Sequence, residues 1–101
     1  MRLSRLFDNT RYWLVNSVFP VDAIATRFHH QLVLVHAFPN GNGRHSRLMT
    51  DRLLRQCTAK PFTWGSNHDL VAPGDARQRY LASLRAADAG DLGQLMQFVR
   101  S

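Results

Sequence analysis

The 101-residue sequence predicts an all-α fold, and three observations support this prediction. Apolar residues recur at intervals of three and four over most of the chain, which is the spacing of one helix face. Gly, Pro and Asn gather in short stretches between these periodic segments, where they are typical of turns. The composition, 45% hydrophobic and 20% charged, is that of a folded globular protein and excludes a disordered or fibrous chain.

Two helices are predicted in the first third of the chain. Residues 3–19 have helical spacing, and Pro20 then blocks continuation of the helix. Asp22 is the expected N-cap of a second helix that ends near His36. The apolar stripe of this helix consists of Ile24, Phe28, Leu32 and Val35. Residues 31–38 are also rich in Leu and Val, so a buried strand remains an alternative there, although the stripe favours a helix.

A tight loop and a third helix follow. Residues 37–43 contain Pro39 together with two Gly and two Asn, which predicts a loop. Residues 44–59 return to helical spacing, and Pro61 marks the end of this segment. The expected inward side chains are Leu48, Met49, Leu53 and Cys57, and the expected outward ones are Arg47, Asp51, Arg52 and Arg55.

Two more helices complete the prediction. Residues 62–74 are rich in Gly, Ser, Asn and Pro and predict a loop. Asp75 is the expected N-cap of a fourth helix, and Gly90 is expected at its C′ position. A short fifth helix follows Asp91, with its apolar face formed by Leu92, Leu95, Met96 and Val99.

The charge balance favours anionic partners. Lys and Arg number 13 against seven Asp and Glu, which gives a net charge of +6, and Lys60 is the only lysine. Guanidinium groups bind phosphate oxygens in pairs, so the arginine excess suits phosphate-containing ligands. A nucleic-acid-binding module remains an alternative, but no known reader motif supports it.

Cysteine content and hydropathy predict the compartment. A single cysteine, Cys57, excludes an internal disulfide and a thiolate metal cluster. No apolar run approaches the length of a membrane span or of an export signal. We therefore expect a cytoplasmic protein without membrane contacts.

Residues 36–47, His-Ala-Phe-Pro-Asn-Gly-Asn-Gly-Arg-His-Ser-Arg, carry the chemistry. Gly41, Asn42 and Gly43 can turn successive backbone N–H groups toward one point, and the following helix adds its positive end. Arg44 and Arg47 lie three positions apart, so their guanidinium groups can converge on the same ligand. This arrangement predicts a polyphosphate site.

His36 is the expected general base of this site. Its ordinary pKa is near neutrality, so it can accept a proton from a hydroxyl that attacks the bound phosphate. Together with the phosphate cradle, it indicates phosphoryl or nucleotidyl transfer.

The same stretch resembles the signature of the Fic, or fido, family, His-x-Phe-x-(acid)-Gly-Asn-Gly-Arg-x-x-Arg. The sequence matches it at His36, Phe38, Gly41, Asn42, Gly43, Arg44 and Arg47. The flanks over roughly residues 21–99 also resemble the family, especially its branch called mobile mystery protein B. The resemblance implies a Fic-like helical bundle with the catalytic loop between two central helices. It also implies that residues 1–101 form one partial domain, without the N-terminal part and its β-hairpin flap.

The resemblance further implies a reaction and a role for each matching residue. Fic enzymes transfer AMP, or another phosphate-containing part of a nucleotide such as ATP, to a Ser, Thr or Tyr hydroxyl of a target protein. By analogy His36 is the base, and Phe38 anchors the loop in the core. The implied catalytic residues are His36, Asn42, Arg44 and Arg47, and the implied nucleotide-binding residues are Asn40, Gly41, Asn42, Gly43, Arg44 and Arg47.

The sequence departs from the signature at two positions. The family's acid, which binds Mg²⁺, is replaced by Asn40, and the usual proline after the histidine is replaced by Ala37. An amide oxygen can ligate Mg²⁺ but lacks the charge of a carboxylate. Asn40 is therefore a weak candidate metal ligand, and a weakened activity or a different donor is expected.

Several other readings remain open. Residues 4–9 nearly match the family's inhibitory motif, and an antitoxin or self-association is a further candidate for restraint. The chain could also be a non-catalytic Fic-like fragment that binds a nucleotide or a partner.

Two alternatives do not involve the Fic family. Gly41 and Gly43 mimic a dinucleotide-binding fingerprint whose third glycine is missing. Four histidines between residues 29 and 45 are a weak indication of zinc.

Overall fold

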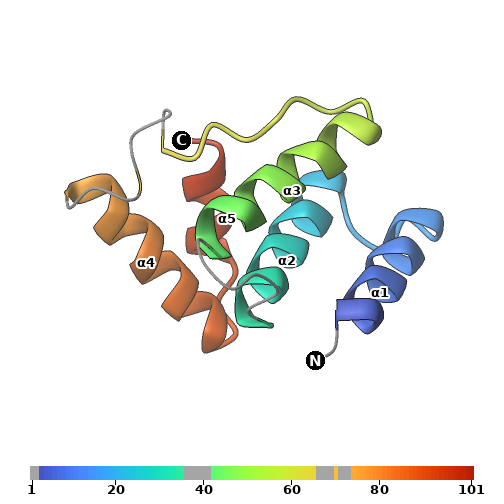
Figure 1. Cartoon of the computed structure of the whole chain (residues 1–101), viewed down its shortest axis with the longest axis horizontal. Helices are drawn as coiled ribbons and strands as arrows, with labels where there is room; N and C mark the ends of the chain where they lie inside the picture. Colours follow the sequence, from blue (N-terminus) through green and yellow to red (C-terminus); the bar gives the residue numbers. More distant parts are fainter. Residues whose placement is uncertain (1–2, 36–41, 66–69, 71–73) are drawn as a thin grey trace. The chain divides into compact units, whose positions relative to one another are not determined.

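The computed structural model describes residues 3–35, 42–65, 70 and 74–101, and these residues form five α-helices and no strand (Figure 1). The helices are α1 (Leu3–Val15), α2 (Val21–Leu34), α3 (Asn42–Gln56), α4 (Asp75–Asp88) and α5 (Gly93–Val99). The all-α prediction is confirmed. The alternative of a strand over residues 31–38 is wrong as far as Val35, because residues 31–34 continue α2.

The chain divides into two compact units, residues 1–61 with α1 to α3 and residues 62–101 with α4 and α5. In the first unit, α2 packs against both α1 and α3, and α2 and α3 run antiparallel side by side (Figure 1). The core of this unit contains Leu6, Phe28 and Leu32, with Val35, Met49 and Leu53 packed against it. α2 is thus the central helix of the unit.

The N-terminus of α2 differs from the prediction. Pro20, not Asp22, occupies the N-cap position, and its carbonyl accepts a hydrogen bond from the Ile24 N–H at 3.0 Å. Asp22 lies inside the first turn instead, where a negative charge still interacts favourably with the helix dipole.

Three helices end in the same way, with a left-handed residue at C′ and two backbone hydrogen bonds that close the last turn. After α4, Gly90 has φ 96°, and the N–H groups of Gly90 and Asp91 donate to the carbonyls of Ala87 and Ala86. The predicted C′ role of Gly90 is confirmed. The same pattern of bonds occurs around Ser17 after α1 and Thr58 after α3, with φ of 48° and 56°.

These two non-glycine ends explain why the predicted helices were too long. α1 ends at Val15 rather than near residue 19, and α3 ends at Gln56 rather than near residue 59. Neither end carries the glycine that usually reveals a left-handed cap, so the periodic pattern gave no stop signal before the next proline.

The buried face of α3 also differs from the prediction. Ser46, Thr50 and Leu54 are fully buried at intervals of four, whereas Leu48 is 58% exposed. Residues two positions apart in a helix are rotated by more than half a turn about its axis, so Leu48 points away from Ser46 and Thr50. Small polar residues, rather than the expected leucine, therefore form part of the contact with α2.

In the second unit α4 packs against α5, and the Tyr80 and Phe98 rings lie 5.5 Å apart between centroids. Residues 63–65 extend along the end of α5: Thr63 and Trp64 donate backbone hydrogen bonds to the Val99 carbonyl at 2.8 and 3.1 Å. Part of the predicted polar loop is thus an ordered apolar segment, since Phe62 and Trp64 are both buried.

At the starts of α4 and α5, the predicted N-cap of α4 is wrong and the predicted short fifth helix is confirmed. Gly74, not Asp75, is the N-cap of α4, and no side chain caps this helix. The short helix expected after Asp91 is present, and the Asp91 Oδ1 accepts a hydrogen bond from the Gly93 N–H at 3.0 Å.

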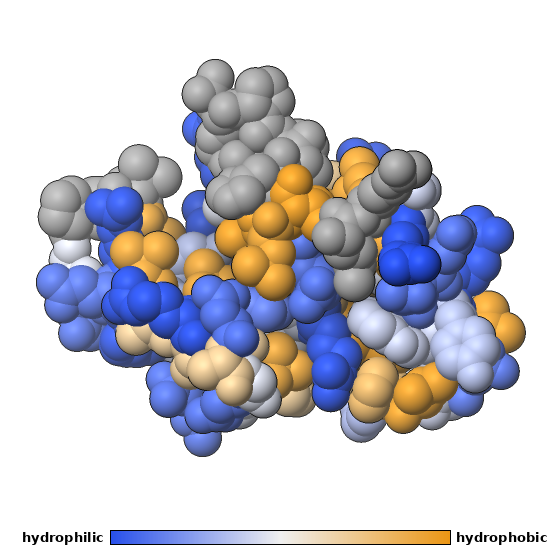
Figure 2. All heavy atoms as spheres, turned by 90° about the horizontal axis from the view of Figure 1, so that it is seen from below, coloured by the Kyte–Doolittle hydropathy of each residue, from blue (hydrophilic) through white to orange (hydrophobic). Residues whose placement is uncertain are grey.

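The surface of the described helices is mixed in polarity. Figure 2 shows hydrophilic and hydrophobic side chains interspersed over one face of the molecule. Among the described residues, no helix has the length and apolarity needed to cross a membrane.

Candidate functional site

The predicted site falls at the junction between α2 and α3. Asn42, Gly43, Arg44 and Arg47 lie in the first two turns of α3, whereas His36, Phe38, Asn40 and Gly41 lie outside the described residues. The structure therefore places the cationic half of the predicted site and gives no geometry for the predicted base.

The start of α3 supplies backbone donors. α3 begins at Asn42, two residues before the predicted start at Arg44, so Asn42 and Gly43 are helical rather than part of the loop. The N–H groups of the first helical turn have no carbonyl partner within the helix and carry the positive end of its dipole. Such a helix end binds anions, and phosphate is the usual ligand.

The two arginines of the site differ in exposure. Arg44 is exposed, whereas Arg47 is half-buried. Three helical positions place both on the same side of α3, within reach of a ligand at the helix start. Arg47 also lies close enough to His29 on α2 for its charge to lower the pKa of that imidazole.

His29 is a buried polar group beneath this helix start. It is fully buried on α2, and its Nδ1 lies 3.4 Å from the Thr50 Oγ1 on α3. Burial lowers the pKa of His29 from 6.5 to about 3, although a hydrogen bond with the Ser46 backbone opposes the shift, and the charges of Arg47 and His30 lower the pKa further. The imidazole is therefore neutral at physiological pH.

Hydrogen bonds around Thr50 connect α2 to α3. The Thr50 hydroxyl donates its proton to the Ser46 carbonyl at 2.7 Å, and the Thr50 oxygen lies 3.4 Å from the Nδ1 of His29. The imidazole of His29 also forms a hydrogen bond with the Ser46 backbone. This buried network joins α2 to the second turn of α3, next to Arg47, and so holds the helix that carries the candidate phosphate ligands.

The sequence analysis noted His29 only as part of a weak zinc indication. Among the described residues, no group of three or more His, Cys, Asp or Glu side chains could hold a metal ion. The sequence did contain a signal for the structural role of His29. This residue lies at helical spacing from Ala25 and Leu32, and all three side chains are buried.

The arrangement fits a polyphosphate. The first turn of α3 carries N–H groups that have no carbonyl partner within the helix and the positive end of the helix dipole, and Arg44 and Arg47 lie in its first two turns. Arg binds phosphate through paired hydrogen bonds.

Comparison with known proteins relates this helical unit to one family. The sequence model of the Fic/DOC family matches residues 1–54, which is more than half of the chain and includes α1, α2 and most of α3. The matched stretch contains all of residues 36–47.

Curated relatives extend the similarity to most of the chain. A protein adenylyltransferase Fic from Drosophila grimshawi is 32% identical over 101 residues, which cover 96% of this chain and 19% of the relative. The protein adenylyltransferase fic-1 from Caenorhabditis elegans is 34% identical over 90 residues, which cover 86% of this chain and 16% of the relative. This chain spans less than a fifth of the length of these relatives. No solved structure matches the chain.

Proposed function

Because the chain belongs to the Fic/DOC family, we propose that it carries the nucleotide site of a transferase that moves AMP from ATP to a protein hydroxyl. The curated relatives are named protein adenylyltransferases, and they align with this chain at about one-third identity. Within the family, the flanks favour the mobile mystery protein B branch.

The observation that carries the proposal is the start of α3. Its first turn supplies backbone donors, and Arg44 and Arg47 add two positive charges on one side of the helix. In this proposal Gly41, Asn42 and Gly43 hold phosphate oxygens through their N–H groups. Arg44 and Arg47 bind the β- and γ-phosphates, where they stabilise the charge that develops on the leaving pyrophosphate.

His36 supplies the acid–base step. The target hydroxyl oxygen attacks the α-phosphorus, the bond from that phosphorus to the β-phosphate oxygen breaks, and pyrophosphate leaves. His36 accepts the hydroxyl proton, as an imidazole of near-neutral pKa can. The target is a protein with an accessible Ser, Thr or Tyr side chain.

Asn40 is the proposed side-chain ligand for Mg²⁺. Mg²⁺ bound there would neutralise phosphate charge during the reaction, as it does in nucleotide sites generally. Asn40 offers a neutral amide oxygen, so this residue contributes less to metal affinity than the family's carboxylate. The expected consequence is a weaker dependence of ATP binding on Mg²⁺.

Further parts of the proposal concern the rest of the protein. We propose that residues 1–101 belong to a single Fic-like domain. An antitoxin that binds this domain is a further proposed partner. A nucleotide-binding module without transferase activity is the alternative.

Incubation with ATP labelled at the α-phosphate tests the proposal. The wild-type chain should transfer the label to protein, whereas His36→Ala should still bind ATP but transfer none. His45→Ala is the control, because His45 lies in the same segment at a variable position of the signature. Equal labelling by the His36 variant would contradict the role of His36, and ATP binding without labelling by the wild type would favour the non-catalytic alternative.

A further inference from the structure

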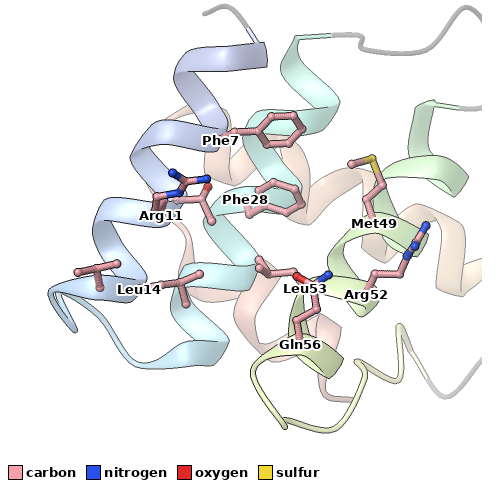
Figure 3. Close-up of a pocket in the computed structure, with 10 residues that line it drawn as sticks. Phe7, Arg11, Leu14, Phe28, Met49, Arg52, Leu53 and Gln56 are labelled. Atoms are coloured by element: carbon pink, nitrogen blue, oxygen red, sulfur yellow. The ribbon is translucent and has the colours of Figure 1, made fainter.

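The first unit contains an apolar groove that the proposed nucleotide site does not use. α1 and α3 both pack against α2, and between them they leave a groove of about 450 Å³ (Figure 3). Figure 3 shows Phe7 and Leu14 projecting from α1, Met49 and Leu53 from α3, and Phe28 from α2 between them. The remaining lining residues are Thr10, Arg11, Val15, Arg52 and Gln56.

Large apolar side chains in this groove remain open to solvent. Phe7 is 43% exposed although its ring stacks on Phe28 with centroids 6.2 Å apart, and Val15 is 75% exposed. Each square ångström of apolar surface removed from water contributes roughly 25 cal/mol, so covering these residues would stabilise a complex. A contiguous apolar surface with a polar rim is typical of an interaction site.

The charges at the rim define the partner. Arg11 on α1 and Arg52 on α3 are both exposed and lie on opposite walls of the groove (Figure 3). Among the described residues that line the groove, none is Asp or Glu. A ligand with an apolar centre and negative charge along both sides would therefore complement the groove.

We propose that this groove binds an amphipathic α-helix of another protein, with acidic residues on both sides of its apolar face. Apolar residues at positions i, i+3, i+4 and i+7 would contact Phe7, Phe28 and Met49, as in other helix-in-groove complexes. Acidic residues beside this face would pair with Arg11 and Arg52, as flanking charges do in coiled coils.

A second copy of this chain does not have this chemistry. α1 carries Arg5 and Arg11 against the single acidic residue Asp8, and α5 carries no charged residue. α4 carries three arginines against two aspartates. The net charge of +6 also opposes association between copies.

Two designed peptides test the charge requirement. Each is a helical peptide of about 18 residues, long enough to form a helix in water. One carries Leu on one face with Glu on both flanks, and the other carries Lys in place of Glu. Fluorescence anisotropy with the full chain should show that the Glu peptide binds at least about tenfold more tightly than the Lys peptide.

Charge-reversal variants test whether the peptide binds in the groove. Arg11→Glu/Arg52→Glu should abolish or invert the preference for the Glu peptide over the Lys peptide. The control Arg5→Glu/Arg55→Glu makes the same change of charge at exposed residues of the same two helices that do not line the groove, and it should preserve the preference. Equal weakening by both double variants would overturn the proposal, because binding would then follow net charge alone.

A second pair of variants tests whether the apolar surface of the groove contributes to peptide binding. Val15→Glu places a charge in the groove and should weaken binding of the Glu peptide about tenfold or more. Leu48→Glu, at an exposed position of α3 outside the groove, should have a much smaller effect. No binding of the Glu peptide, or a dimer of the wild-type chain that Val15→Glu alone dissociates, would overturn the proposal.

Discussion

His29 shows how one buried side chain supports the candidate site at a distance from the chemistry. Its imidazole is neutral, fully buried and joined through Thr50 and Ser46 to the start of α3. An unpaired polar group in this position would cost about 1–3 kcal/mol, so the network must stay intact while α3 is docked on α2. His29 thus acts on Arg47 through helix position and not through contact with a ligand.

The depressed pKa of His29 predicts a pH-dependent stability. The unfolded chain binds a proton near pH 6.5 and the folded chain only near pH 3, so the stabilisation is complete above pH 6.5 and is lost as the pH falls toward 3. The expected loss is about 1.4 kcal/mol per pH unit in this window.

Urea unfolding of the wild type and of His29→Gln at pH 7 and pH 5 measures this effect. Glutamine can donate and accept hydrogen bonds but does not titrate, so the variant should lose clearly less stability on acidification. Carboxylates contribute equally to both proteins, which makes the difference between them specific to His29. An identical pH dependence of the two proteins would show that His29 is not the titrating group.

Gly65 illustrates a close approach that the sequence could not reveal. Its φ is +74°, and a Cβ added there would lie 2.9 Å from Cε1 of Phe98. Gly90 also has a positive φ, +96°, but a Cβ there would meet nothing within 4 Å. An alanine at either position would adopt an unfavourable left-handed backbone, but only an alanine at position 65 would also clash with the Phe98 ring.

Gly65→Ala should accordingly destabilise the protein more than Gly90→Ala. The left-handed backbone costs either alanine about 1–2 kcal/mol, and displacement of the Phe98 ring adds to this cost only at position 65. Thermal unfolding of the two variants checks the order. If Gly90→Ala proved the more damaging, the packing of Gly65 against Phe98 would be wrong.

The ends of α1, α3 and α4 differ in how accurately the sequence predicted them, and the difference depends on whether glycine occupies the C′ position. Gly90 marks the end of α4, and that end was predicted correctly. Ser17 and Thr58 adopt the same left-handed conformation without glycine, and the predicted ends of α1 and α3 were too late. The backbone geometry at these positions is fixed by the hydrogen bonds of the last turn, which composition alone does not show.

Thr58→Gly should stabilise the protein. A β-branched residue with φ of 56° is strained, and glycine adopts this conformation without a steric cost. The expected gain is about 1 kcal/mol. Thermal unfolding measures it, with Thr58→Ala as the control because alanine retains the Cβ and therefore most of the strain. Equal stability of the glycine and alanine variants would contradict the strain at this cap.

At the scale of the whole molecule, the site and the family match coincide in one unit. The matched residues 1–54 lie within the unit of residues 1–61, which also contains the start of α3 with Arg44 and Arg47. The resemblance to the signature predicted the family, and the match of the Fic/DOC model confirms this prediction, whereas the place of the site stays a prediction. The burial of Ser46 and Thr50 between α2 and α3 was not predicted, because both residues are polar and the apolar pattern assigned Leu48 to the inward face instead.

Calorimetric titration of the chain with ATP and Mg²⁺ tests the central claim, a phosphate site at the start of α3, most directly. The Arg44→Ala/Arg47→Ala double variant should bind ATP at least about tenfold more weakly than the wild type, since each arginine makes charged hydrogen bonds. The double variant Arg5→Ala/Arg55→Ala loses the same charge at exposed residues outside the signature and should bind almost normally. Arg47→Ala alone should weaken ATP binding more than AMP binding. A folded wild type that binds no ATP, or equal losses in the two double variants, would contradict the site.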